Sequence, residues 1–249
     1  MTKIIFEGNL SPIEKETKDF AMVLKNVVSS EICDFVANEF RMLERCVNLM
    51  NPDTQAGKEI GLTESFSIYS PLFTETLSLL IQPKIEEAVG KKLYPTYSYG
   101  RIYKNGAELE PHLDRRSSEY TISLCVYKEP DQDWQLVVKH LNKKCDYFSL
   151  EKGDLLIYPG RDLNHWREGK FAGKEQIQVF IQYVDANGTS QDLKWDGRPA
   201  MGMPWESARA DVHQGLEQMM DTLKQVVSDE HLDAATPTLL DTLTNIKTN

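Results

Sequence analysis

Two histidines and an aspartate are the side chains whose types and spacing best suit metal chemistry. The stretch ELEPHLDRR places His112 and Asp114 two positions apart, so on an extended strand both side chains point to the same face. His165 comes later, where GDLLIYPGRDLNHW indicates a strand, a turn and a second short strand. Two histidines and one carboxylate from opposite strands of a small barrel form a facial triad, which leaves open coordination positions on Fe(II).

The sequence around these residues helps to decide whether they bind a metal. H-x-D triplets are frequent by chance, and the plain alternative is that His112 is a surface residue and His165 a core histidine. Against this alternative, a glycine and an aspartate open an apolar strand just before His165, and a strand with one polar face follows it. The remaining histidines lack such surroundings and are interpreted as surface or packing residues: His140, His213 and His231.

Composition limits the class of protein. The 249 residues are 41% hydrophobic and 27% charged, which is typical of a globular domain. There is no apolar run of about 18 residues to span a membrane and no pattern of a secretory signal, so we expect a cytoplasmic protein. The four cysteines are widely separated and are expected to be free thiols. A net charge of −10 argues against a nucleic-acid partner, because such binding depends on lysine and arginine.

Helical and polar segments are expected ahead of the strands that carry the triad. They are distinguished by helical spacing of apolar residues or by glycine-containing polar sequence. The polar segment is a loop that could cover an active site. The expected elements are a strand over 20–28, a helix capped by Ser30, a loop over 51–64, and a helix over 74–89 that Pro83 kinks and Gly90 ends.

Residues 94–185 show short strands with closely spaced turn signals, which indicates an all-β barrel or sandwich. Eight such strands fit a double-stranded β-helix of the jelly-roll or cupin-like kind. With its helices, the chain is expected to be mainly β with flanking helices, in the α+β class. The expected strands are 96–103, 109–114, 119–127, 134–138, 146–150, 154–158, 163–166 and 175–184.

The C-terminal part has a different pattern. Residues 206–227 place apolar side chains at helical spacing, which predicts an amphipathic helix that packs on the barrel or forms a homodimer. We expect one structural domain with three parts. These are an N-terminal strand and helices over 1–92, the catalytic core over 93–185, and a loop and helix over 186–249.

Two stretches of the core resemble a known family. LYPTYSYGRIYKNGAELEPHLDRRSSEYTISLCVY and GDLLIYPGRDLNHWREGKFAGKEQIQVFIQYVD cover about residues 93–185. They resemble the 2-oxoglutarate/Fe(II)-dependent oxygenase superfamily, most closely its prolyl 4-hydroxylase-like branch. The segments HWRE and QIQVFIQYVD look like a subgroup seen in cyanobacteria and marine phages.

The resemblance implies a reaction and a set of metal ligands. Fe(II) would be held by His112, Asp114 and His165, and 2-oxoglutarate would chelate the iron. Oxygen would convert 2-oxoglutarate to succinate and CO2 while a C–H bond of the substrate is hydroxylated, with ascorbate as a reductant. An aspartate at position 114 favours hydroxylation over halogenation, which in related enzymes uses the position that a glycine or alanine vacates.

The resemblance also implies a cation for the far carboxylate of 2-oxoglutarate, shortly after the second histidine. Lys174 has this position, although Glu175 and Gln176 depart from the usual cation followed by an aromatic residue. Two arginines compete for the role, because planar guanidinium suits carboxylates. The further candidates for this cosubstrate pocket are Arg167, Arg101, Tyr103 and Gln178.

The substrate class stays open between a peptidyl residue such as proline and a small amino-acid-like metabolite, with O2 as the other reactant. Arg116 and Tyr99 are the candidates for substrate contact. Two other function classes remain as alternatives. One is a non-oxygenase metal barrel, such as a hydrolase or isomerase, and the other is a binding module without turnover. Dependence on 2-oxoglutarate would discriminate between these classes.

Overall fold

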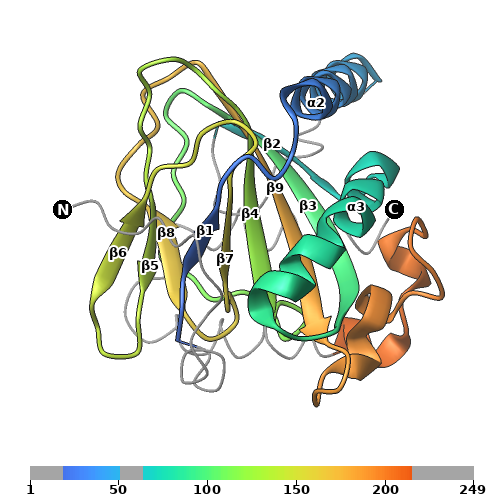
Figure 1. Ribbon diagram of the computed structural model, residues 1–249. Coiled ribbons are helices and arrows are strands. Elements are labelled where there is room, and N and C mark those ends of the chain that lie inside the picture. Colours follow the sequence, from blue (N-terminus) through green and yellow to red (C-terminus); the bar gives the residue numbers. More distant parts are fainter. Residues whose placement is uncertain (1–18, 51–63, 215–249) are drawn as a thin grey trace, which may run out of the picture.

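The computed structural model describes residues 19–50 and 64–214 (Figure 1). In these ranges the chain forms two antiparallel sheets and two long helices. The strands are β1 (Met22–Leu24), β2 (Ser65–Tyr69), β3 (Leu93–Lys104), β4 (Tyr120–Lys128), β5 (Leu136–Lys139), β6 (Cys145–Phe148), β7 (Leu155–Tyr158), β8 (Asn164–Arg167) and β9 (Glu175–Asp185). The helices are α2 (Ser30–Met50), α3 (Leu72–Val89) and the short 3-10 helices η1 (Gln191–Gly197) and η2 (Trp205–Ser207).

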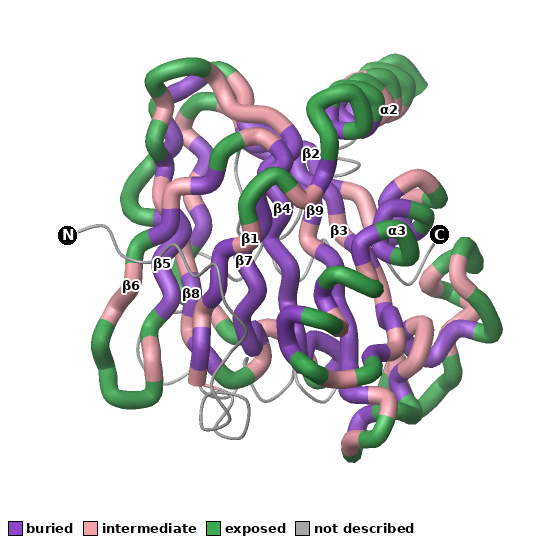
Figure 2. The backbone as a smooth tube through the Cα atoms, viewed as in Figure 1, coloured by how far each residue is buried: buried purple, intermediate pink, exposed green. Residues whose placement is uncertain are grey.

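The larger sheet has the strand order β1-β7-β4-β9-β3-β2, and α2 and α3 contact one of its faces. Alternating apolar side chains supply that face, since successive residues of a strand point to opposite sides. Ile177, Val179 and Ile181 of β9 are fully buried in the same core as Phe40 of α2 and Ile85 of α3. Figure 2 shows this burial along the central strands, whereas the outer side of α2 is exposed.

The opposite face of the larger sheet is polar and nevertheless buried. On β9 it carries Gln176, Gln178 and Gln182, which are 4%, 1% and 2% exposed. Arg101 of β3 and Thr121 of β4 are also buried. Burial of polar side chains costs free energy unless they form hydrogen bonds. A buried polar face therefore indicates a functional site.

The smaller sheet, with the order β6-β5-β8, encloses this polar face. A second apolar core forms there, and it contains Tyr103, Trp134, Leu136, Phe148 and Tyr158. The architecture is therefore mainly β with flanking helices, as expected from the sequence. The candidate metal ligands lie at the edge of this interior, because His165 belongs to β8.

Three strand assignments from the sequence need correction. The strand expected over 20–28 is limited to β1, because Asn26 takes a left-handed backbone conformation with φ 52°. The segment 109–114 is not a strand and has only one bridge residue, because its pairing with β8 shifts register: His112 exchanges hydrogen bonds with His165, whereas Arg167 donates to Leu109. The strand β2 was not predicted, although its sequence SFSIY alternates in polarity.

Both expected long helices are present with shifted starts. Ser29 rather than Ser30 caps α2, because its Oγ accepts the backbone N–H of Ile32 at 3.5 Å. Helix α3 begins two residues earlier than expected. Gly90 ends α3 in the left-handed conformation, as predicted.

The expected C-terminal helix is only partly within the described residues. Positions 206–209 are not α-helical, and helix begins at Ala210 and continues to residue 214. The rest of the predicted helix, the loop expected over 51–64 except for Glu64, and the last residues lie outside the described part of the chain. No helix among the described residues is long and apolar enough to cross a membrane.

Gly100 of β3 gives a test of how α2 packs on the larger sheet. A Cβ at this position would lie 1.9 Å from the Phe40 ring of α2. We therefore predict that Gly100→Ala lowers the free energy of unfolding by about 1–3 kcal/mol, as overpacking does. Chemical denaturation measures the loss, and adding Phe40→Leu to Gly100→Ala should recover part of it. An unchanged stability in the single variant would contradict this packing.

Candidate metal centre

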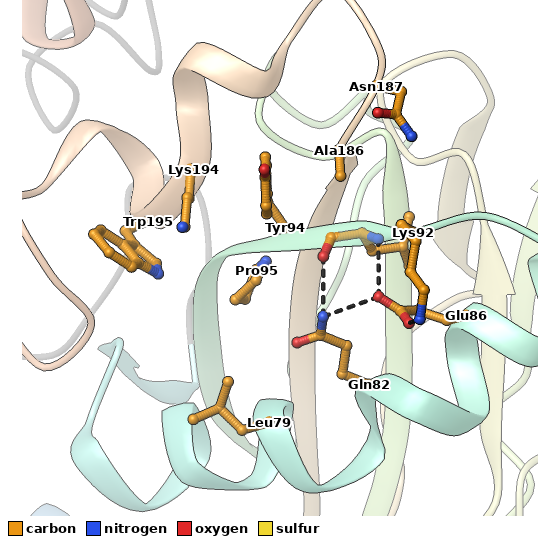
Figure 3. Close-up of a pocket in the computed structure, with 11 residues that line it drawn as sticks. Leu79, Gln82, Glu86, Lys92, Tyr94, Pro95, Ala186, Asn187, Lys194 and Trp195 are labelled. Atoms are coloured by element: carbon orange, nitrogen blue, oxygen red, sulfur yellow. Dashed lines mark hydrogen bonds and ion pairs between the residues drawn. The ribbon is translucent and has the colours of Figure 1, made fainter.

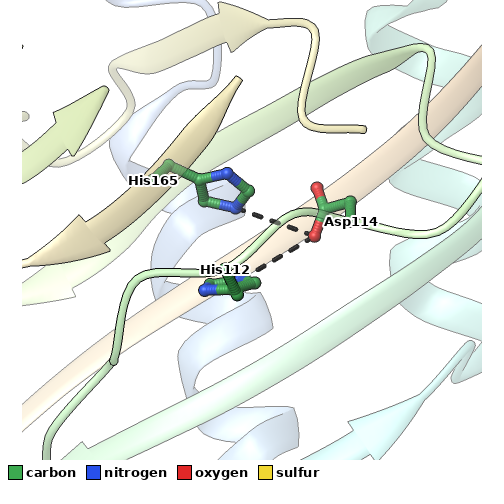
Figure 4. A group of neighbouring side chains, drawn as sticks. All are labelled: His112, Asp114 and His165. Carbon is green, nitrogen blue, oxygen red and sulfur yellow. Dashed lines mark ion pairs between the residues drawn. The ribbon is translucent and has the colours of Figure 1, made fainter. Parts of the chain in front are cut away.

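The structure brings His112, Asp114 and His165 together at the edge of the interior (Figure 4). One potential ligand atom from each residue lies within 4.8 Å of the other two. Asp114 Oδ1 is 3.9 Å from His112 Nε2 and 3.7 Å from His165 Nε2. These are separations that a single ion could bridge, since bonds from a first-row metal to nitrogen or oxygen are about 2.0–2.2 Å.

Backbone pairing places the two histidines. The N–H of His112 donates to the carbonyl of His165 at 3.1 Å, and the reverse bond is 3.0 Å long. The segment before Asp114 therefore lies against β8 as one antiparallel pair, although it is not a strand. The two imidazole rings are consequently close, with centroids 4.3 Å apart.

Hydrogen bonds to the backbone orient both imidazole rings. Nδ1 of His112 is 2.8 Å from the carbonyl oxygen of Glu110, and Nδ1 of His165 is 3.0 Å from that of Leu163. A carbonyl can only accept, so each Nδ1 carries the proton and each Nε2 presents its lone pair. Both lone pairs are thus available on the side that faces Asp114, as metal ligation requires.

A second set of contacts orients Asp114. Thr121 Oγ1 donates to its Oδ2 at 2.7 Å, and the same hydroxyl is 2.7 Å from the side-chain amide of Gln182. Gly160 makes room for this arrangement, because a Cβ there would lie 2.1 Å from Asp114 Oδ2. The carboxylate therefore uses Oδ2 for the protein and turns Oδ1 towards the histidines.

Exposure and charge differ across the three residues. The side chain of His165 is 4% exposed, that of Asp114 17% and that of His112 39%, so the site opens to solvent on the His112 side. Burial and the neighbouring His165 lower the pKa of His112, although Asp114 acts in the opposite direction. The neutral imidazole that a metal needs is therefore the favoured form at neutral pH.

The buried polar interior next to His165 contains the arginines that the sequence singled out. Arg167 and Arg101 are 5% and 6% exposed, and both guanidinium groups are near the ring of Tyr103, at 5.8 and 5.4 Å from its centroid. Arg101 also donates to the Tyr103 hydroxyl at 3.2 Å. The side-chain amide of Gln178 is oriented so that its nitrogen donates to the carbonyl of Leu124. Its oxygen then accepts a hydrogen bond from Arg167 at 3.2 Å.

The other sequence candidates lie elsewhere. Lys174 is exposed in the turn before β9, where its backbone N–H donates to Glu129 at 2.7 Å. Arg116 is exposed and pairs with Asp192 at 2.8 Å. Tyr99 is half-buried beside Arg101, whose guanidinium is 5.3 Å from the centroid of its ring.

Several residues around the triad were not found from the sequence. They contact its members from distant parts of the chain, and only Thr121 and Gln182 gave any signal, as polar residues at alternate positions of strands. Tyr158 of β7 packs edge-on against the ring of His165 at 4.8 Å. Its hydroxyl is buried and has no hydrogen-bond partner among the described residues.

A separate open cleft of about 550 Å³ lies where the end of α3 meets the start of β3 (Figure 3). Lys194 lies at its edge, 4.7 Å from the centroid of the Tyr94 ring and 4.3 Å from that of Trp195. None of the three triad residues lines this cleft. This cleft and the candidate metal centre are therefore different places.

Comparisons with known proteins show the fold. No family model and no curated protein matches the chain. A solved prolyl-4-hydroxylase from Pseudomonas putida is 12% identical, with a TM-score of 0.51 over 70% of this chain and 96% of that one. HygX from Streptomyces hygroscopicus, solved with nickel, 2-oxoglutarate and hygromycin B, is 12% identical with a TM-score of 0.53, over 78% of this chain and 95% of that one.

A third solved structure is the epimerase SnoN in complex with Fe3+, alpha ketoglutarate and nogalamycin RO. It is 12% identical, with a TM-score of 0.56 over 80% of this chain and 94% of that one. The chain therefore has the double-stranded β-helix fold of the 2-oxoglutarate/Fe(II) oxygenases. The expected fold class is confirmed.

Loss of one histidine should abolish metal binding. We predict that His165→Ala binds no Co(II) at concentrations that saturate the unmodified protein, because two ligands remain of three. Titration calorimetry and the visible absorption of Co(II) measure this. His140→Gln is the matched control, since His140 pairs with Asp19 at 2.7 Å and does not belong to the triad's cluster. Full binding by His165→Ala would refute the site.

The Thr121 hydroxyl gives a finer test. Thr121→Val keeps the shape of the side chain but leaves Asp114 Oδ2 without its donor. Variants of this kind cost about 10–100-fold in metal affinity, and we expect a loss in that range for Co(II). Thr121→Ser retains the hydroxyl and should bind nearly as tightly as the unmodified protein. Equal affinities for the valine and serine variants would contradict the role of this hydrogen bond.

Proposed function

We propose that this protein is an Fe(II)- and 2-oxoglutarate-dependent dioxygenase that hydroxylates an unactivated C–H bond. The observation that carries the proposal is the convergence of His112 Nε2, His165 Nε2 and Asp114 Oδ1 within a fold of this class. In the reaction, substrate, O2 and 2-oxoglutarate give hydroxylated substrate, succinate and CO2. One oxygen atom enters the substrate and the other enters succinate.

The three residues fit the metal that this function requires. Two neutral imidazoles and one carboxylate are the donor set of a facial triad, and both lone pairs are oriented by backbone carbonyls. His112, Asp114 and His165 would hold Fe(II), which when bound supplies the activation of O2. Asp114 remains free on Oδ1 because Thr121 occupies Oδ2.

Arg167 is the residue we propose for the far carboxylate of 2-oxoglutarate. It follows His165 by two positions on β8, so both side chains point to the same face, about 6.6 Å apart along the strand. This separation is comparable to the length of a five-carbon dicarboxylate. Arg167 has no ion pair with any described residue, and its Nε is buried without a hydrogen-bond partner in the described part of the chain.

A buried cation without a counter-ion is costly, and an anionic ligand removes that cost. The buried hydroxyl of Tyr158, near both His165 and Arg167, is a second unused donor in the same interior. Tyr103, Arg101 and Gln178 complete the proposed cosubstrate pocket. Lys174 is the weaker candidate, since it is exposed.

For the substrate we propose a proline-like peptidyl residue or a small amino-acid-like molecule. The motif EPHLD around the first two ligands supports this, as does the fold it shares with the Pseudomonas putida prolyl-4-hydroxylase. Two other proteins of this fold were solved with small molecules, hygromycin B and nogalamycin RO, so the fold accepts metabolites as well. Tyr99, beside Arg101, and the exposed Arg116 are the proposed substrate contacts. The net charge of −10 disfavours a nucleic acid.

Arg167 gives a test of the cosubstrate pocket. We predict that Arg167→Gln weakens 2-oxoglutarate binding by about 2–5 kcal/mol, because the far carboxylate loses its charged partner. Equilibrium binding to the Co(II)-loaded protein measures this, with Arg167→Lys expected to retain part of the affinity. Lys174→Gln is the matched control and should bind normally. The reverse outcome, with loss only in Lys174→Gln, would move the role to the turn before β9.

A substrate screen tests the proposed class. Release of succinate in the presence of Fe(II), 2-oxoglutarate and ascorbate should rise when proline-containing peptides or proline-like amino acids are added. Mass spectrometry should then find one added oxygen in the stimulating compound. Stimulation by nucleotides or lipids alone would overturn the proposed class. Hydrolysis or isomerisation without 2-oxoglutarate would instead favour a metal-dependent hydrolase or isomerase.

A further inference from the structure

A buried ion pair joins the loop after Asp114 to the C-terminal segment. Arg115 Nη2 is 2.6 Å from Asp196 Oδ2, and the side chain of Asp196 is fully buried. Tyr69 donates to the same oxygen at 2.8 Å. The guanidinium of Arg115 is 4.1 Å from the centroid of the Tyr97 ring and 5.1 Å from that of Trp205. Arg115 is therefore held by groups outside the triad.

The C-terminal segment is built to present Asp196 at this place. Trp195 and Asp196 both have left-handed backbone conformations, with φ of 57° and 59°. Such conformations are unfavourable for residues other than glycine and persist only where the surroundings impose them. Arg198 supplies that restraint, since it is buried and bonds the Thr96 carbonyl at 3.1 Å and Glu75 of α3.

A neighbouring ion pair between the same two segments is exposed, in contrast to the buried pair between Arg115 and Asp196. Arg116 and Asp192 connect the same two segments at 2.8 Å, but their side chains are 60% and 40% exposed. An exposed pair of this kind contributes little to stability. The pair between Arg115 and Asp196 is different because its carboxylate has no access to water.

If Arg115 were released from Asp196, its guanidinium would compete with the metal for the carboxylate of Asp114. Arg115 directly follows Asp114, in a stretch without regular structure between the bridge at His112 and β4. Asp114 Oδ1 has two partners, both at more than 3.5 Å, and a guanidinium binds carboxylates strongly and in bidentate fashion. A freed Arg115 therefore has an acceptor close by, and it is the oxygen that the metal needs.

We propose that Asp196 is a positioning residue for the metal centre: it holds the guanidinium of Arg115 on the Tyr97 ring and so keeps Asp114 available to the metal. This inference rests on the proposed metal site. It gives the C-terminal segment a role in the site, although that segment lies outside the barrel.

Co(II) titrations of the full chain test the inference, with visible absorption and calorimetry as readouts. Asp196→Asn should weaken Co(II) binding by about tenfold or more, the range for residues that orient metal ligands. Arg115→Gln breaks the same ion pair but removes the competing cation, so it should bind like the unmodified protein. The double variant Asp196→Asn/Arg115→Gln should recover the affinity that Asp196→Asn loses. Asp192→Asn is the matched control and should bind normally.

The results of these titrations distinguish a wrong role for Asp196 from a wrong metal site. All titrations are made well below the thermal midpoint of each variant, and if Asp196→Asn does not fold, Arg115→Gln and the double variant still decide. Weak binding by the double variant or by Arg115→Gln would overturn the inference and indicate a structural role for the pair. Normal binding by Asp196→Asn would also overturn it. Absence of Co(II) binding in the unmodified protein would overturn the proposed metal site, and this inference with it.

Discussion

The pair of backbone hydrogen bonds between His112 and His165 is the interaction on which the candidate site depends. It joins a segment without regular structure to β8, and it brings the two imidazole rings together with their centroids 4.3 Å apart and their planes tilted by 54°. The position of Asp114 follows, because it is two residues further along the same extended segment. The carbonyls of Glu110 and Leu163 then select the orientation of each ring.

The fold meets a second constraint by placing polar side chains between two sheets. The larger sheet uses one face for helix packing and the other for arginines, glutamines, serine and threonine, which are almost fully buried. In a structural core such groups would be replaced by apolar ones at little cost. Arg167 without a counter-ion and Tyr158 without an acceptor in the described part of the chain are the clearest cases. Binding of a small anion, as proposed for 2-oxoglutarate, would satisfy both groups with one ligand.

Much of this arrangement follows from local patterns in the sequence. The run of short strands with closely spaced turns predicted the fold. The spacing of His112 and Asp114, with His165 after a glycine and a strand, predicted the three clustered residues. Properties that depend on non-local pairing were not predictable. The depth of Arg167 relative to Lys174 depends on how the turn before β9 is placed, and the contact of Thr121 with Asp114 depends on the register of β4 with β9. Asp196 could not be recognised from the sequence, because its proposed role depends on a left-handed backbone conformation and on Arg115, which is distant in the sequence.

The proposed function couples the triad to the oxidative decarboxylation of 2-oxoglutarate. The most direct measurement uses 2-oxoglutarate labelled with carbon-14 at C1, the carboxyl group that leaves as CO2. With Fe(II) and O2, the purified protein should release labelled CO2, and the release should cease when a chelator removes the metal or when Asp114 is replaced by Ala. Release that is equal with and without Asp114, or no release at any Fe(II) concentration that loads the protein, would contradict this account.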